Sequence, residues 1–386
     1  MKQIKIFILL IILIITSCSS INTNTVKADE LSDNINDQLA NIDLTELEYY
    51  FNGLENTIAN ISFLDYVNQL LNGEYNLDFT SIFTYISNMF FKNLFSFLPI
   101  FISIVAIGIF SGIMNGFRSK YFSEGTGDII SFVCLLSIIL LLSSTISGIY
   151  LNTENTIKNI ANLTEIMSPI ILTLMIAGGG TSSASIYKPT VAFLSNGIIN
   201  IFLSIILPLT MLIIIFTILS HFSEGIKISK FIDTITSIIK WIIGLIITIF
   251  GTYLTIQGIS SASYDGISIK AVKYAISNSV PLVGGFIKDG FDLVVVSSVL
   301  IKNAVGVTSV IALIFTILAP ILNIIAFSLT LKFASAILEP ITDKRITGFC
   351  ESTSKCLSYF TVSLLVVGLM LFITILLIMF TANSYF

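Results

Sequence analysis

Uncharged apolar stretches of about 20 residues recur from Leu94 to the end of the chain. Two of them are Leu94–Met114 and Ile129–Tyr150. A helix of about 20 residues crosses about 30 Å of hydrocarbon, so each stretch predicts a transmembrane helix. Neither stretch alternates apolar and polar residues with a period of two, as the strands of an outer-membrane barrel do. The pattern therefore predicts an all-α, polytopic helical membrane protein.

The apolar pattern is interrupted between Ile166 and Phe222. Met167–Ala177 is apolar but short, and it leads into a segment of glycines and serines that ends in a lysine and a proline: Gly178, Gly179, Gly180, Ser182, Ser183, Ser185, Lys188 and Pro189. Each glycine inside a helix costs about 1 kcal/mol relative to alanine. The residue before a proline is pushed away from helical angles. We therefore predict a buried turn or kink between Gly178 and Pro189, with a break at Lys188, and hence a broken or re-entrant helix.

The chain repeats part of this interruption. Gly258–Ser263 resembles Gly180–Ser185, and the serine–asparagine pairs that follow Lys188 and Lys270 lie at the same offsets. Matching interruptions in two halves are typical of secondary transporters around their binding sites. Small residues also recur in membrane proteins because they let helices approach closely. We expect a second break at Ser260–Asp265, and the repeated segment adds these candidate pore residues: Ser260, Ser261, Asp265, Lys270 and Lys273.

Later spans are expected at Ile238–Gly258, at Asn303–Leu338 with a break at Pro320, and at Leu357–Phe380. The distribution of basic residues does not decide on which side of the membrane each loop lies. A re-entrant hairpin at residues 166–200 places five bases inside: Arg118, Lys120, Lys227, Lys230 and Lys240. Two full crossings there also place five inside, namely Arg118, Lys120, Lys188, Lys270 and Lys273. The positive-inside rule therefore does not choose between the two arrangements.

Residues 1–28 are expected to be a signal peptide. Lys2 and Lys5 precede ten apolar residues, Ile6–Ile15, which are too few to span a membrane. Two processing sites compete: Ile15–Cys18 fits a bacterial lipobox, with lipidation of Cys18 and cleavage before it, and Val26–Ala28 fits an ordinary cleavage site. In either case the next segment starts outside the cytoplasm.

Residues 29–90 are expected to form an acidic, helical extracytoplasmic region before a membrane domain at 91–386. Eleven acidic residues and no Lys or Arg lie between Ala28 and Phe91: Asp29, Glu30, Asp33, Asp37, Asp43, Glu46, Glu48, Glu55, Asp65, Glu74 and Asp78. Such uncompensated negative charge avoids nucleic acid and anionic lipid surfaces. The sequence therefore predicts no nucleic-acid partner.

Apolar residues in this acidic region follow helical spacing. One stripe steps by four, three, four and three residues: Leu47, Phe51, Leu54, Ile58 and Ile61. Another precedes it: Leu31, Ile35, Leu39 and Ile42. The stripes either pack on each other or on the membrane surface, or they form a docking face for a partner helix.

Composition agrees with a membrane protein and gives no sign of catalysis. Of the 386 residues, 55% are apolar and 11% are charged, whereas a soluble domain carries about a quarter charged residues. Four cysteines and one histidine, His221, have no zinc-binding spacing. The sequence also lacks a phosphate-binding loop and the kinase and hydrolase signatures. We expect no enzyme activity, no metal and no cofactor.

Ionisable residues near apolar segments are the remaining functional candidates, because charge at membrane depth is costly. They are Lys188, Lys240, Lys273, Asp289, Asp292, Lys302 and Lys332. Snorkelling of long side chains to the interface suits Lys240, Lys302 and Lys332. Short carboxylates cannot snorkel, so Asp289 and Asp292 join the candidate pore residues.

Four segments carry a family resemblance: Tyr264–Ala275 with Ser277–Gly285, Leu300–Gly306, Glu339–Arg345, and the Met167–Pro169 start with its Ser182–Pro189 break. Together they resemble the stage III sporulation protein AE family of spore-forming Firmicutes, over most of the chain from about residue 90. The resemblance implies a place in the mother-cell membrane around the forespore, in a secretion-like, trans-envelope channel complex. It also implies other stage III sporulation membrane proteins and a cytoplasmic secretion-type ATPase as partners, besides the lipid bilayer.

The alternative reading is a self-contained secondary transporter or permease with its binding site at the broken helices. A transporter should bring Asp289, Asp292 or Lys188 together in a closed internal site. A channel component should instead expose apolar patches outside the lipid belt, where partners dock.

Overall fold

The computed structural model describes residues 34–35, 37–39, 42–52, 63–71, 79–116, 124–222, 228–279 and 284–381. Only the backbone is described at 52, 63, 66, 79, 81–82, 115, 124–128, 258–279 and 284–289. The elements in this part of the chain are helical. They are α3 (Thr45–Asn52), α4 (Phe63–Leu71), α5 (Phe79–Ser96), α6 (Leu98–Gly116), α8 (Glu124–Ala177), α9 (Thr181–Ala192), α10 (Ile199–Ile201), α11 (Leu207–Phe222), α12 (Ser229–Ser279), α13 (Gly284–Leu338) and α14 (Lys344–Phe380). The predicted all-α architecture is confirmed.

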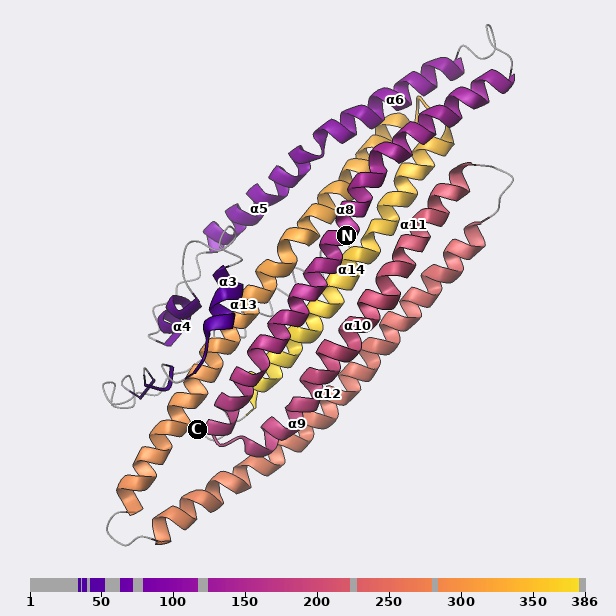
Figure 1. Ribbon diagram of the computed structural model, residues 1–386. Helices are drawn as coiled ribbons and strands as arrows, with labels where there is room; N and C mark the ends of the chain where they lie inside the picture. The colour runs from indigo at the N-terminus through magenta and orange to yellow at the C-terminus, as the bar shows by residue number, and fades with distance from the viewer. Residues whose placement is uncertain are drawn as a thin grey trace.

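Six helical segments are long and apolar enough to cross a membrane. They lie in an elongated bundle whose long helices run roughly side by side (Figure 1). Helix α8 has 54 residues, which at 1.5 Å per residue makes about 81 Å, more than twice the hydrocarbon thickness. Helices α12 and α13, with 51 and 55 residues, are of similar length. The bundle must therefore extend well beyond any bilayer that it crosses.

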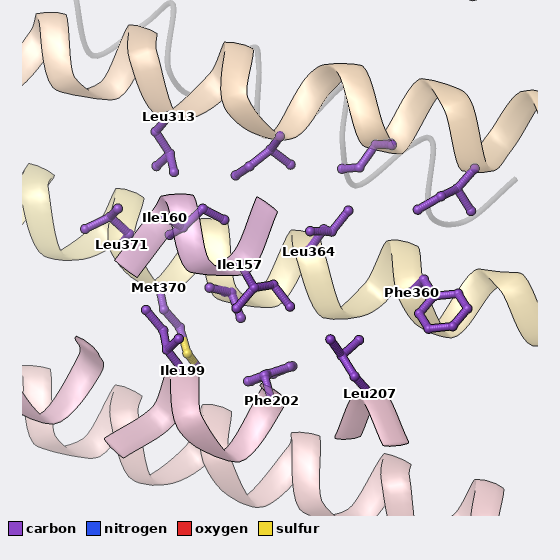
Figure 2. Close-up of a cluster of buried hydrophobic side chains, with 14 of the residues drawn as sticks. Ile157, Ile160, Ile199, Phe202, Leu207, Leu313, Phe360, Leu364, Met370 and Leu371 are labelled. Atoms are coloured by element: carbon purple, nitrogen blue, oxygen red, sulfur yellow. The ribbon is translucent and has the colours of Figure 1, made fainter. Parts of the chain in front are cut away.

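The core of the bundle forms where α13 and α14 pack against α8 and the arm made of α9, α10 and α11. We call residues Thr181–Phe222 the α9–α11 arm. Figure 2 shows side chains from all four elements meeting, among them Ile157 of α8, Phe202 of the arm, Leu313 of α13 and Leu364 of α14. Ile157, Phe202 and Leu364 are fully buried. The apolar stripes that predicted the spans thus pack against one another over much of the length of the bundle.

Helix α8 joins two segments that the sequence pattern separates. The polar stretch after Tyr150, which separates two apolar runs of the sequence, is helical throughout. Its Thr153, Ile157, Ile160 and Leu163 are fully buried at helical spacing, and this packing keeps the stretch in the helix. Helix α13 likewise continues through Pro320, so the break expected there is absent.

The short α3 packs against the bundle. Leu47 and Phe51 lie on one face and are buried in the core, as predicted for that stripe; Leu54, Ile58 and Ile61 lie outside the described residues. The Tyr50 hydroxyl and the Thr316 hydroxyl of α13 are 3.0 Å apart. At the start of α3, Asp43 accepts a 3.1 Å hydrogen bond from the Thr45 N–H, and bonds from Thr45 lower the pKa of this carboxyl. Leu47 and Phe51 therefore pack against other helices of the same chain.

Helix α5 crosses the domain boundary expected at residue 90, and the apolar stretch in it begins at Phe83. Helix α6 then packs closely against the C-terminal end of α13. A Cβ on Gly108 would lie 2.5 Å from Leu338, and one on Gly112 would overlap the carbonyl oxygen of Ile341. Gly108 and Gly112 form a G-x-x-x-G motif, which permits such close approach.

Helix α8 and the α9–α11 arm form a hairpin of two long helical rods, so of the two arrangements left open for residues 166–200 the short re-entrant hairpin is absent. The start of α8 and the end of α11 lie at the same end of the bundle, where the rings of Phe132 and Phe222 are 5.5 Å apart.

Candidate functional site

The predicted interruption is a tight turn at Gly178–Gly180. Helix α8 ends at Ala177, the Gly180 N–H donates to Met175 O over 2.8 Å, and the Gly179 N–H donates to Ile176 O over 2.9 Å. These two bonds form a Schellman motif, whose penultimate residue takes a left-handed conformation. Gly179 has a φ of 86°, which glycine adopts without the strain that a Cβ would cause. The predicted non-helical turn is confirmed at this position.

The break expected at Lys188 is wrong. Helix α9 starts at Thr181 and continues through Pro189 to Ala192. The distortion comes later, as two π-helical segments at Phe193–Ile198 and Phe202–Ile206. In a π-helix the backbone bonds reach one residue further, so the α9–α11 arm keeps a helical backbone through both segments.

The second break, at Ser260–Asp265, is also wrong. The backbone of α12 is helical from Ser229 to Ser279, so Ser260, Ser261, Asp265, Lys270 and Lys273 all lie within one helix. Gly258 and Gly266 flank the expected break, and each costs about 1 kcal/mol in a helix, which the rest of a 51-residue helix outweighs. The sequence echo therefore does not correspond to a structural repeat.

A buried polar cluster lies beside the Gly178–Gly180 turn. Lys302 of α13 is fully buried, and its Nζ donates to Thr381 O over 2.6 Å and to Met379 O over 3.1 Å. The Tyr187 hydroxyl of α9 lies 3.1 Å from the Thr381 hydroxyl. A cation at a helix C-terminus binds the last carbonyls and opposes the negative end of the helix dipole. Lys302 therefore fixes the end of α14 and does not snorkel, contrary to the sequence-based expectation.

A second polar contact joins the α9–α11 arm to α12. The Thr190 hydroxyl donates to the Gln257 side-chain oxygen, and the Gln257 amide donates to Ile186 O over 2.9 Å. Both Thr190 and Gln257 are buried. The sequence does not predict these hydrogen bonds of Lys302 and Gln257, because the residues that they bind are distant along the chain.

The remaining candidate residues whose side chains are described do not share one burial environment. Ser183 is buried, Ser182 is half-buried, and Ser185 and Lys188 are exposed on α9. Asp292 is half-buried on α13. The side chain of Asp289 and the whole of Cys18 lie outside the described part. Because Lys188 is exposed, it cannot belong to the closed site that a transporter would need.

One groove with a volume of about 370 Å³ lies between α12 and α14. It is lined by Lys240, Ile243 and Gly244 of α12 and by Ser358, Tyr359 and Val362 of α14. None of the candidate pore residues lines it. Among the described residues, no group of three or more His, Cys, Asp or Glu side chains could hold a metal ion.

The turn gives a prediction with a matched control. Gly179→Leu forces a left-handed conformation on a residue with a Cβ, which costs about 1–2 kcal/mol. Gly244→Leu places the same side chain in open space on α12 and should leave stability unchanged or slightly raised. We expect the thermal midpoint of the purified chain in mild detergent to fall only for Gly179→Leu. Equal midpoints for the two variants would contradict the strained turn.

Comparison with known proteins identifies a family and a relative that match this chain. The family model described as stage III sporulation protein AE matches residues 61–382. A protein named stage III sporulation protein AE, from Bacillus subtilis (strain 168), is 30% identical over 253 residues. That match covers 66% of this chain and 63% of the relative. No solved structure matches the chain.

Proposed function

Because the chain belongs to the stage III sporulation protein AE family and so has a role in sporulation, we propose that it is a non-enzymatic membrane component of a channel complex between mother cell and forespore. The observation that carries the proposal is the family match over residues 61–382 together with six helices able to cross a membrane within that region. The mother-cell membrane around the forespore is its proposed location.

Partners are part of the proposal. The sequence has no phosphate-binding loop, so work done on a transported species would come from a cytoplasmic ATPase of the secretion type. Other stage III sporulation membrane proteins would be its further partners in the complex. Exposed aromatic residues support further contacts: Phe83, Phe91 and Phe95 of α5 are 71%, 52% and 65% exposed. Large exposed apolar side chains such as these face either lipid or a partner helix.

Deletion of the gene tests the proposal in cells. A component of a sporulation channel is dispensable for vegetative growth, so we expect normal growth rates and an arrest of sporulation after engulfment. Counts of heat-resistant spores and membrane staining of engulfed forespores measure the arrest. A copy of the gene at another locus should restore spore formation.

Two results would contradict it. A deletion strain that forms spores at the parental level would refute a required role in the channel. Slower vegetative growth would instead favour the self-contained transporter.

A further inference from the structure

The middle of α8 carries four asparagines on one face. Asn152, Asn155, Asn159 and Asn162 are spaced by three, four and three residues, and all four are exposed. This spacing aligns side chains along one side of a helix. The opposite side of the same turns is buried in the core, as Figure 2 shows for Ile157 and Ile160. We call the four residues the asparagine face.

Elements that contact α8 also expose polar side chains. Asn196 and Asn200 are exposed on the α9–α11 arm, which packs against α8. Helix α3 also contacts α8, and it exposes Glu46. On α8 itself the exposed Lys158 pairs with Glu154 over 2.6 Å. Exposed amides and charged groups are costly in hydrocarbon, so the asparagine face of α8 faces water.

Helix α12 lies at the same height along the bundle as the asparagine face. At one end the ring of Tyr150 is 6.2 Å from Phe360, and the residue before Phe360 lines the groove with Lys240 of α12. At the other end α8 turns into α9, where Thr190 binds Gln257 of α12. The stretch of α12 from Lys240 to Gln257 thus runs along the part of the bundle that carries the asparagines.

This stretch of α12 has the character of a lipid-facing helix. Leu245, Ile247, Ile249 and Ile256 are 40%, 45%, 48% and 60% exposed. No charged residue occurs between Lys240 and Asp265. The candidate span Ser229–Gln257 is also the least buried of the six, at 22%. An exposed apolar helix of this length is stable in hydrocarbon and unfavourable in water.

One level of the bundle therefore has an apolar side on α12 and a polar side on α8. Polar side chains at membrane depth face a protein interior or a water-filled cavity. We propose that the asparagine face lines a water-filled passage through the membrane, whose remaining wall is supplied by further copies of this chain. The inference rests on the proposed channel function and deepens it. Amide groups both donate and accept hydrogen bonds, and the exposed Lys158 beside them is paired with Glu154, so this wall suits hydrated polar solutes.

Further copies of the same chain fit this arrangement of a polar side on α8 and an apolar side on α12. A molecule with a polar stripe on one side cannot enclose water by itself. Identical molecules arranged head-to-tail close into a ring and bring the same stripe to the axis. The ring would place every asparagine face on the lumen and every α12 in the lipid.

Thiol accessibility in membranes of sporulating cells tests the proposal on the full chain. The buried Cys134, Cys350 and Cys356 are replaced by alanine, and the labelling of this parent, which keeps Cys18, is subtracted as background. Single cysteines then replace Asn155 and Asn159, with Ile247 and Ile249 of α12 as matched controls. A charged, water-soluble methanethiosulfonate reagent should modify the two α8 positions about ten-fold faster or more, because hydrocarbon excludes it from α12.

Two labelling results would overturn the proposal. Slow reaction at Asn155→Cys and Asn159→Cys, equal to that of the controls, would show that the asparagines do not contact water. Rapid reaction at all four positions would show that this level lies outside the lipid and lines no passage. The readout is independent of sporulation, so a deletion strain that forms normal spores would refute the proposed function without changing the labelling contrast.

A bifunctional thiol reagent tests the participation of further copies. Asn155→Cys should yield a cross-linked dimer of the chain, whereas Ile247→Cys should not, because lipid separates the α12 helices of a ring. Absence of a dimer from Asn155→Cys would refute the ring of identical chains.

Discussion

Replacement of Gly112 by leucine is expected to give the largest loss of stability among single changes in the described part of the chain. A Cβ at this position overlaps the backbone carbonyl of Ile341 and lies 2.8 Å from the Ile341 side chain. A backbone carbonyl cannot rotate away as a flexible side chain can, so α6 must shift away from the end of α13. Overpacking of this kind costs about 3 kcal/mol.

The thermal midpoint of the purified chain in mild detergent measures the effect of Gly112→Leu. Gly116→Leu, one helical turn further along α6, is the matched control, since a Cβ there meets nothing within 4 Å. We expect a large drop in the midpoint for Gly112→Leu and little change for Gly116→Leu. A similar drop in both variants would mean that any leucine in this part of α6 disturbs the fold, and that the close contact with Ile341 is not its cause.

Lys302→Met is expected to have the second large effect. The variant keeps a long, unbranched side chain but removes the buried donor, so the carbonyls of Met379 and Thr381 lose its hydrogen bonds. A buried acceptor that loses its partner costs about 1–3 kcal/mol. The C-terminal end of α14, which Lys302 holds, should then fray.

Amide hydrogen exchange at the end of α14 measures the local fraying, and the thermal midpoint measures the change in the stability of the whole chain. Lys332→Met is the control on the same helix, because Lys332 is exposed. We expect faster exchange in the last turn of α14 and a lower midpoint for Lys302→Met alone. Unchanged exchange in that variant would show that the lysine does not hold the helix end.

The sequence alone determined the class of the protein and the place of its tightest turn. Runs of about 20 apolar residues can satisfy their backbone in hydrocarbon only as helices or closed barrels, and their pattern excludes the barrel. Three consecutive glycines mark the reversal between α8 and α9, because Gly179 takes a left-handed conformation that residues with a Cβ avoid. The family resemblance was also readable from local motifs, since it depends on residue order and not on contacts.

Only the tertiary structure decided which interruptions stay helical and which charges are buried. The serines after Gly258 and the asparagines after Tyr150 resemble loop sequence, yet both stretches remain in helices. In α8 the reason is that Thr153, Ile157 and Ile160 find partners across the bundle. Lys302 resembles a snorkelling lysine until α14, 77 residues away along the chain, brings its last carbonyls to the ammonium group. Local sequence sets helix propensity, but the free energy of burial depends on residues that only the fold brings together.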